Sequence, residues 1–399
     1  MRRQNAWVRS AASLLVGLAV FPSLVHGAEP AKPGGAAFSG EVWTMPGYDS
    51  NVYQAPGEPY TDYFADFYPE VNPQARSGQF LDLALDLRYQ RPMGENDGLE
   101  ARYDFNGRKH LAEELSAADV NSHKLQLGWS HMGGRDSQTD LGLYLKKRQQ
   151  AYVDHDLGGV KLIDGTDVSN RYNYLGRGLV AKYGTSAGEM DWKVSAELET
   201  RDYEDPVVVS QYDQSRRGVQ GDVRWKLSAP LSLRVNLGVA RVDYDDRPAK
   251  NEKGEAFSSH PRLSYTYQEL GGTLRNRFSN GLIGYMDLTR TNRMDDYVHY
   301  NDYTEDQAKL RIRLKGGKDL RIRLVLQVWR RDYPNAYAFD NPYKGPLEYT
   351  GTKVGAKGNW ELNRQFELMS QVDYTDQNST DLRYQYQQFQ VMAGVGYKF

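Results

Sequence analysis

Hydrophobic and polar residues alternate with a period of two along most of the chain, segment after segment. In one such segment Leu81 and Leu83 would share one face, while Asp82 and Asp86 would share the other. This alternation is typical of β-strands whose two faces meet different surroundings, because successive side chains of a strand point to opposite sides. Helical periodicity is almost absent, so the pattern predicts an all-β chain.

The connections between these segments alternate between short and long ones. Gly133 to Asp136 and Gly316 to Asp319 are short, whereas Asp154 to Ser169 and Asp246 to His260 are long and polar. A soluble β-sandwich would also show period-two strands, but the loop alternation favours an up-and-down antiparallel transmembrane β-barrel with short periplasmic turns and long extracellular loops. The segments number about sixteen, an even count as bacterial single-chain barrels require.

The first residues have the pattern of a secretory signal peptide. A basic stretch over residues 1–9 precedes an apolar run over residues 10–25, and Gly27 supplies a small residue before a possible cleavage site. The alternative, a membrane anchor helix, is disfavoured because the run falls short of the about 20 residues that a span needs and contains Pro22.

We therefore divide the chain into a signal peptide over residues 1–27, a short periplasmic N-terminal segment over residues 28–38, and an outer-membrane β-barrel over residues 39–399. Cleavage would remove three arginines and take the formal net charge from −2 to −5. The mature chain would then be an exported protein with a small net charge.

Composition agrees with a barrel and excludes several other classes. Hydrophobic residues make up 39% of the chain and the mean hydropathy is −0.72, which excludes a helical membrane protein. The chain has 29 tyrosines and no cysteine, so disorder is disfavoured and disulfides, thiol nucleophiles and cysteine-ligated metal sites are excluded. The histidines show no metal-ligand spacing, and we expect neither a metal nor a cofactor.

The last segment looks like the C-terminal strand that the barrel-assembly machinery of Gram-negative bacteria recognises. Val395, Tyr397 and Phe399 share one face, and the sequence stops on Phe399. We expect this machinery, outer-membrane lipid and lipopolysaccharide to be partners of the chain, and the outer membrane of a Gram-negative bacterium to be its location.

Strand phase also predicts which side chains face the lumen, since the apolar face of each strand meets lipid. The later strands would present a basic wall made of Arg224, Lys226, Arg234, Lys309, Arg311, Arg313, Lys315, Arg321, Arg323, Lys353 and Lys357. So many charges require water or one another, and about sixteen strands leave room for an aqueous channel. Such a wall would favour anionic solutes. Alternatively, it pairs across the lumen with acidic residues such as Asp82 and Asp86.

Tyrosines recur where strands meet long loops, as at Tyr203, Tyr244 and Tyr333. They could belong to the aromatic girdle at the membrane surface, or, if they face the lumen, line the channel mouth and stack on sugar rings. The first long loop could also fold inward as a constriction; its aromatic residues are Tyr60, Tyr63, Phe64, Phe67 and Tyr68.

The stretch Gly47-Tyr48-Asp49-Ser50-Asn51-Val52 resembles the opening of a family of outer-membrane β-barrel porins associated with exopolysaccharide secretion, and residues 371–379 are similar to that family too. The resemblance implies a porin through which a secreted polysaccharide leaves the cell beside a periplasmic polysaccharide-export protein. It supplies no binding residues.

Two other functions stay open. The barrel could be a sleeve around a partner such as a multihaem cytochrome, or a lipid hydrolase, for which Ser130 and His131 are the nearest candidates. We expect a channel rather than an enzyme, and nothing in the sequence points to nucleic-acid binding.

Overall fold

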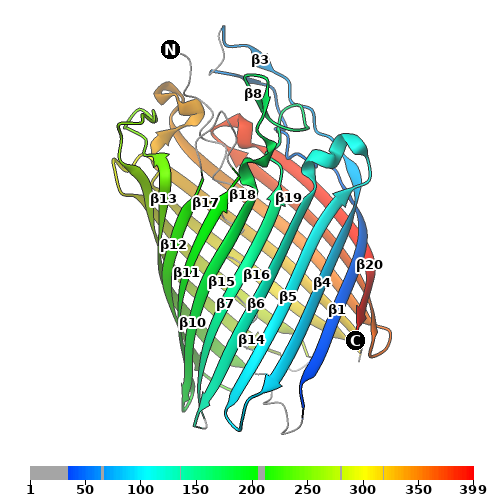
Figure 1. Ribbon diagram of the computed structural model, residues 1–399. Coiled ribbons are helices and arrows are strands. Elements are labelled where there is room, and N and C mark those ends of the chain that lie inside the picture. The colour runs from blue at the N-terminus through cyan, green and yellow to red at the C-terminus, as the bar shows by residue number, and fades with distance from the viewer. Residues whose placement is uncertain (1–34, 64–66, 135, 205–211, 279–280, 318) are drawn as a thin grey trace.

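The computed structural model describes residues 35–63, 67–134, 136–204, 212–278, 281–317 and 319–399. They form a closed antiparallel barrel of sixteen tilted strands, so the predicted fold class is confirmed (Figure 1). The predicted signal peptide lies outside these residues. Among the described residues, no helix is both long and apolar enough to cross a membrane.

Each barrel strand pairs with its neighbours in chain order, and β1 pairs with β20 to close the sheet and remove its edges. The strands are β1 (Ala37–Asp49), β4 (Gly78–Pro92), β5 (Asp97–His110), β6 (Val120–Gly133), β7 (Ser137–Gln150), β10 (Tyr174–Ala187), β11 (Met190–Tyr203), β12 (Gln214–Lys226), β13 (Leu231–Pro248), β14 (Arg262–Arg277), β15 (Ile283–Asp295), β16 (Tyr303–Gly316), β17 (Leu320–Tyr337), β18 (Pro346–Glu361), β19 (Phe366–Ser379) and β20 (Tyr386–Lys398).

One end of the barrel has short turns and the other has long loops with small elements of their own (Figure 1). The turn between β10 and β11 holds only two residues, and Gly188 adopts a φ of 58°, which a tight hairpin turn requires and glycine tolerates. The small loop elements are the hairpins β2 (Tyr60–Thr61) with β3 (Glu70–Val71) and β8 (Leu162–Ile163) with β9 (Thr166–Asp167), and the 3-10 turns η2 (Glu113–Ala118), η3 (Ser169–Tyr172), η4 (Ala338–Asp340), η5 (Pro342–Lys344) and η6 (Leu382–Tyr384).

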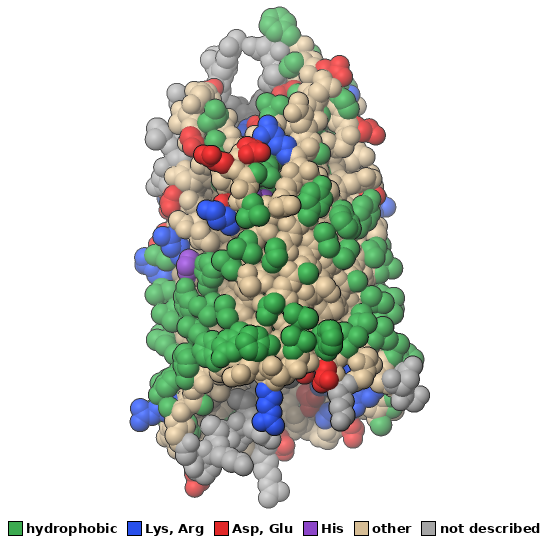
Figure 2. Space-filling view, turned by 90° about the vertical axis from the view of Figure 1, so that its right-hand side faces the viewer, with side chains coloured by type: hydrophobic (Ala, Val, Ile, Leu, Met, Phe, Trp, Pro, Cys, Tyr) green, Lys and Arg blue, Asp and Glu red, His purple; other side chains and the backbone are tan. Residues whose placement is uncertain are grey.

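An apolar belt surrounds the outer wall. On β17, for example, Leu324, Leu326 and Val328 point outward and each is about 40% exposed. Figure 2 shows hydrophobic side chains gathered around the outer wall, with charged residues above and below them. A belt of this size is stable only against lipid, and a closed barrel satisfies its backbone hydrogen bonds there. The chain is an outer-membrane β-barrel.

The strands continue beyond this belt on the side of the long loops. β13 and β17 have 18 residues each, more than the about 9 to 11 that cross the hydrocarbon. The outward positions of β17 change from Val328 to Arg330 and Asp332 where the belt ends. The inward positions of these extensions hold a buried cluster rich in tyrosine, described below.

Residues 47–52, the stretch that resembles the exopolysaccharide-associated porins, help to close the barrel. The buried carboxylate of Asp49 accepts hydrogen bonds from Gln388 Nε2 at 2.8 Å and Gln390 Nε2 at 2.6 Å. Asn51 Nδ2 donates to the carbonyl oxygen of Gln387 at 3.1 Å and to that of Ala55 at 3.0 Å. These contacts join the first strand to the last and fix the start of the first long loop, which explains why a polar motif is buried here.

The C-terminal strand β20 ends at the same junction, where it pairs with β1. The backbone N–H of Phe399 donates to Gly40 O at 3.0 Å, and the N–H of Gly40 donates to Phe399 O at 2.9 Å. Val395 and Phe399 are 39% and 47% exposed on the outer wall, and the ring of Tyr397 stacks on that of Phe399. Recognition of these residues by the assembly machinery stays a prediction.

Candidate functional site: the barrel lumen

The predicted basic wall separates into two groups. The group on β12 and β13 lies beside carboxylates: Asp191 is 3.8 Å from Arg224 and 3.6 Å from Lys226. Arg234 Nε donates a hydrogen bond of 2.9 Å to Asp222. This part of the wall is therefore neutralised by its neighbours.

The second group lies on β16, β17 and β18, and some of its members are paired as well. Arg311 donates two hydrogen bonds of 2.7 Å to Asp287, which lies on the neighbouring strand β15. Lys353 is 3.7 Å from Asp373, and Arg321 donates to Glu361. These contacts neutralise only some members of the group.

The other members of this predicted group have no carboxylate within 4.0 Å among the described residues; they are Lys309, Arg313, Lys315, Arg323 and Lys357. The strand register makes Arg313 the direct partner of Arg323, and Arg323 the direct partner of Lys357. Like charges placed opposite each other destabilise a sheet. We call the row of Arg313, Arg323 and Lys357 the cationic row.

On the early strands β4 and β5 the lumen arginines are paired with carboxylates. Arg108 on β5 donates two hydrogen bonds, of 2.7 and 2.8 Å, to Asp82 on β4. Arg102 bonds to Asp86 and lies 2.8 Å from Asp104. The wall of β4 and β5 is therefore mixed and paired. On β6 and β7, Lys124 and Lys146 face each other in register without a carboxylate within 4.0 Å among the described residues, but their ammonium groups lie 4.4 and 5.7 Å from the ring centres of Tyr144 and Tyr174.

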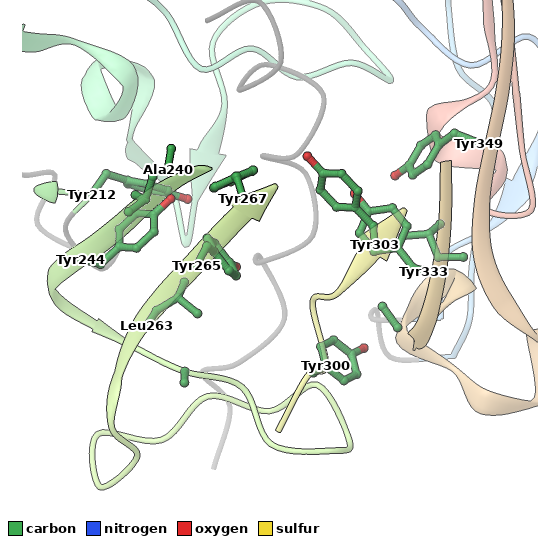
Figure 3. Packing of buried hydrophobic residues seen from close by; sticks show 14 residues of the cluster. Tyr212, Ala240, Tyr244, Leu263, Tyr265, Tyr267, Tyr300, Tyr303, Tyr333 and Tyr349 are labelled. Atoms are coloured by element: carbon green, nitrogen blue, oxygen red, sulfur yellow. The ribbon is translucent and has the colours of Figure 1, made fainter. Parts of the chain in front are cut away.

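A cluster of buried tyrosines fills the inward side of the strand extensions near the extracellular end. Figure 3 shows its tyrosines in two groups, Tyr244 and Tyr265 on β13 and β14, and Tyr303, Tyr333 and Tyr349 on β16 to β18. Within each group the rings make edge and tilted contacts, at 6.0 Å between the centroids of Tyr244 and Tyr265, 5.4 Å between those of Tyr303 and Tyr333, and 5.9 Å between those of Tyr333 and Tyr349. We call it the tyrosine cluster.

Buried arginines run through the tyrosine cluster. The guanidinium of Arg293 lies 4.4 Å from the ring centres of both Tyr265 and Tyr303, and its Nη2 donates to Asn301 O at 2.6 Å. Sequence reasoning missed Arg293. Its phase on β15, shared with Asp287 and Asp295, was the signal that could have placed it inside.

Arg331 is a second arginine that sequence reasoning missed. It donates to Glu305 from Nε at 2.7 Å, and its guanidinium lies 4.7 Å from the ring centre of Tyr303. Both Arg331 and Glu305 are buried. Ion pairing, hydrogen bonding and cation–π contacts therefore compensate the charge in this half of the lumen.

The three predicted mouth aromatics belong to this interior. Tyr244 and Tyr333 are each only 3% exposed, and Tyr203 packs on Tyr174 and Tyr212 at 5.1 and 5.9 Å between ring centroids. They face inward, so the lipid-facing girdle interpretation does not hold for them. Their ring faces are covered by other side chains, and stacking on sugar rings would need the cluster to open.

The first long loop lies against other extracellular loops. Tyr60 is buried and its ring centroid is 5.9 Å from that of Phe339 in η4, while Tyr63 contacts the same ring at 5.4 Å. The N–H of Gly57 donates to Gln385 O beside η6 at 3.0 Å. Phe67 is 99% exposed, and Phe64 is outside the described residues. The loop thus rests on loops at the mouth, and constriction of the pore by it stays a prediction.

Two further loops pack together beside the cluster. Lys250, between β13 and β14, places its ammonium 5.0 Å from the ring centre of Tyr300, between β15 and β16. Burial lowers the pKa of Lys250 and raises the pKa of the Tyr300 hydroxyl, which also donates to Asp340 at 3.1 Å. The extracellular end therefore has an ordered polar and aromatic interior rather than loose loops.

The hydrolase candidates do not form a catalytic pair. Ser130 and His131 are consecutive on β6, so their side chains point to opposite sides of the wall. His131 lies 3.0 Å from Asp97 and stacks on Trp129 at the outer surface. In the part of the chain that the structure describes, no group of three acidic or histidine side chains has the geometry to hold a metal.

The barrel resembles solved outer-membrane porins. OccAB1 of Acinetobacter baumannii is 8% identical with a TM-score of 0.51, over 91% of this chain and 97% of that one. An anion-selective porin from Comamonas acidovorans is 12% identical with a TM-score of 0.48, over 92% of this chain and 99% of that one. A bacterial polysaccharide outer membrane secretin is 11% identical with a TM-score of 0.46, over 90% of this chain and 97% of that one.

At these identities the likeness shows a shared fold, a porin-like barrel, and nothing about the solute. No family model matches the chain. A search of curated proteins likewise gives no match.

Proposed function

We propose that this outer-membrane barrel is a channel whose lumen favours anionic solutes. The observation that carries the proposal is the cationic row of Arg313, Arg323 and Lys357, three positive charges in direct cross-strand register without a carboxylate within 4.0 Å among the described residues. Such an arrangement costs stability, so a benefit to transport is the natural reason for it.

The surroundings of the row strengthen its effect on a passing ion. Lys309 and Lys315 lie on the same inward face of β16 and have no described carboxylate partner either. A single-sign wall backed by low-dielectric lipid concentrates the field in the lumen and raises the local concentration of counter-ions. Rings of lysine and arginine select anions in other pores by this effect.

An acidic polysaccharide is the finer form of the proposal. A polymer of uronic acids carries one carboxylate on each sugar, which suits a row of fixed cations. The resemblance of residues 47–52 to exopolysaccharide-associated porins supports this choice of solute, although Asp49 and Asn51 themselves serve the barrel seam. The periplasmic export protein that this model of transport needs is part of the same proposal.

The sleeve around a cytochrome is less well supported. A sleeve needs a lumen that a folded partner can enter, whereas the extracellular half holds the tyrosine cluster and the loops packed against it. A partner would have to displace buried aromatic side chains such as Tyr333 and Tyr349.

Single-channel recording in planar bilayers under a KCl gradient tests the proposal. We expect the wild-type barrel to give steady channels whose reversal potential indicates a preference for anions. The variant Arg313→Gln/Arg323→Gln/Lys357→Gln should lose most of that anion preference. The matched control is Arg290→Gln/Arg330→Gln, which removes exposed positive charges from the outer wall and should keep the wild-type selectivity.

The outcomes separate the parts of the proposal. Absence of current from correctly folded barrel would refute a channel, and unchanged selectivity in the triple variant would refute the role of the cationic row. A polyuronate added from the periplasmic side should block the wild-type current, and the triple variant should need a several-fold higher concentration. Lack of any block would refute the polysaccharide.

A further inference from the structure

A groove of about 710 Å³ lies in the wall formed by β6, β7, β10, β11 and β12. Most of the side chains that line it point outward, toward lipid. At one end Arg177 pairs with Thr200, and Thr200 pairs with Ser215 across β11 and β12; Arg217 is two residues further along β12, opposite Leu198. The groove therefore has a polar end with two guanidinium groups over a floor of hydroxyls.

The rest of the groove is apolar. Leu143, Leu179 and Leu198 follow one another in cross-strand register on β7, β10 and β11, and each is about half exposed. On β11 Leu198 is farther from the extracellular end than Thr200 is. The leucines thus lie within the apolar belt, and the polar end lies at its outer boundary, where the outer leaflet has its headgroups.

The two arginines are held loosely. Arg177 Nη2 is 3.3 Å from Asp202, and Arg217 Nη2 is 3.6 Å from Asp243, but neither guanidinium makes a hydrogen bond with the described residues. Their side chains are 61% and 65% exposed. Exposed pairs of this kind contribute little, so a stronger ligand can replace the carboxylates.

Some outward-facing arginines elsewhere are bound more tightly. Arg330 on β17 donates a hydrogen bond of 2.8 Å from Nε to Asp332 and has Glu348 at 3.5 Å as well. Arg241 on β13 donates to Asp243 at 2.8 Å. Arg262 and Arg290 are held as loosely as the groove arginines, at 3.8 Å from Asp246 and 3.6 Å from Asp306, but neither lines the groove, where two such arginines lie beside two hydroxyls.

The outward-facing charges are also unevenly distributed, with basic residues in excess near the groove. At the extracellular ends of β5 to β12 the outward positions of the described strands carry four basic residues and one acidic residue; these are Lys109, Lys147, Arg177, Arg217 and Asp202. On β16 to β18 the corresponding positions carry more acid than base, namely Asp306, Arg330, Asp332 and Glu348. The groove is the part of the wall that suits an anionic headgroup.

We propose that this groove binds a phosphorylated glycolipid of the outer leaflet, lipopolysaccharide through its lipid A. A phosphate would accept hydrogen bonds from Arg177, Arg217 and the hydroxyl of Thr200, since guanidinium groups bind phosphate in a bidentate manner. Acyl chains would cover Leu143, Leu179 and Leu198. The site is separate from the lumen and goes beyond transport.

Native mass spectrometry of the full barrel in detergent tests the site, with bisphosphorylated hexa-acyl lipid A as the probe. We expect wild-type barrel to retain one tightly held lipid, and Arg177→Gln/Arg217→Gln to bind it at least about tenfold more weakly, since two charge-assisted contacts are lost. The control Arg290→Gln/Arg330→Gln removes the same charge from β15 and β17, outside the groove, and should bind as the wild type does.

A second variant and a second lipid complete the test. Ser215→Trp fills the floor of the groove without changing charge and should also weaken binding, while dephosphorylated lipid A should bind wild-type barrel weakly. The proposal is wrong if Arg177→Gln/Arg217→Gln binds lipid A as tightly as the wild type, if the control loses as much, or if removal of the phosphates makes no difference. Conductance plays no part in this readout, so failure of the channel proposal would be seen separately.

Discussion

Strand β17 carries arginines into both halves of the lumen, and the two halves treat them differently. In the extracellular half, Arg331 is 6% exposed, bonded to Glu305 and covered by the ring of Tyr303. In the periplasmic half, Arg323 is exposed and stands directly between Arg313 and Lys357. The same residue type on the same face of one strand is thus part of a packed interior above and of an uncompensated charged wall below.

The difference follows from access to water. A buried charge must be paired and hydrogen-bonded, because desolvation is costly. A wall residue in a hydrated lumen can remain unpaired at small cost, because water screens its neighbours. The extracellular half therefore stabilises the barrel, whereas the periplasmic half can serve a solute. Neutralising Arg331 and neutralising Arg323 should therefore change stability in opposite directions.

The largest effect should come from Arg331→Gln. The substitution leaves the buried carboxylate of Glu305 without its partner and removes the cation above Tyr303. Breaking a buried ion pair in this way costs about 3 kcal/mol of unfolding free energy. Urea unfolding in lipid vesicles, followed by tryptophan fluorescence, measures it.

The control is the double variant Arg331→Met/Glu305→Gln, which removes both charges. It should recover a large part of the loss, since an apolar replacement of a buried pair is often close to neutral. A loss below about 1 kcal/mol for Arg331→Gln would show that water reaches the pair and that the two halves do not differ as described.

A smaller effect is expected for Tyr303→Leu. The ring of Tyr303 lies 4.4 Å from the guanidinium of Arg293 and 4.7 Å from that of Arg331, so the change removes two buried cation–π contacts. We expect a loss of about 2 kcal/mol. Tyr285→Leu is the matched variant in the other half, where the ring lies 4.7 Å from Arg311. Tyr285→Leu should lower the unfolding free energy by only about 0.5 kcal/mol, because that site is open to water. Equal losses for the two variants in the same unfolding assay would show that the two halves of the lumen do not differ.

The fold could be predicted from the sequence because it depends on local patterns. Period-two alternation assigns Arg313 and Tyr333 to the inward face without any knowledge of the neighbouring strand. Alternating short and long connections then select a barrel. The first strand begins at Ala37, just before the predicted start at residue 39, because pairing with β4 extends past the last alternating residue.

The compensation of charge could not be predicted in the same way. Whether Arg234 meets Asp222, or Arg323 meets Arg313 instead, depends on the register between strands. Register is a property of two segments and the turn that joins them. The basic wall therefore looked uniform in sequence, although the structure divides it into neutralised and free parts.

The tyrosines show a second limit of the sequence. An Asp-Tyr pair at the end of a strand is compatible with a lipid-facing girdle and with an inward ring. Only the positions of Arg293 on β15 and of Arg331 on the same strand β17 reveal why Tyr333 is buried: the cluster packs its rings around their guanidinium groups. Such an interior is assembled from several strands and has no signature in any one of them.

The smallest effect, and the one of opposite sign, is expected for Arg323→Gln. Removing the central charge of the cationic row relieves two direct like-charge contacts, with Arg313 and with Lys357. The unfolding free energy should therefore rise by about 0.5 kcal/mol at low salt, and the gain should shrink as salt screens the row. The same urea assay at two salt concentrations measures it.

Arg234→Gln is the matched control, because it removes a lumen arginine that is hydrogen-bonded to Asp222. It should lower the unfolding free energy slightly at low salt, so the unfolding free energies of the two variants should differ from the wild-type value in opposite directions. If Arg323→Gln destabilised the barrel as Arg234→Gln does, a carboxylate or an ordered anion would have to hold Arg323 in the folded protein. The cationic row would then belong with the compensated half of the lumen, and anion selectivity would need another source.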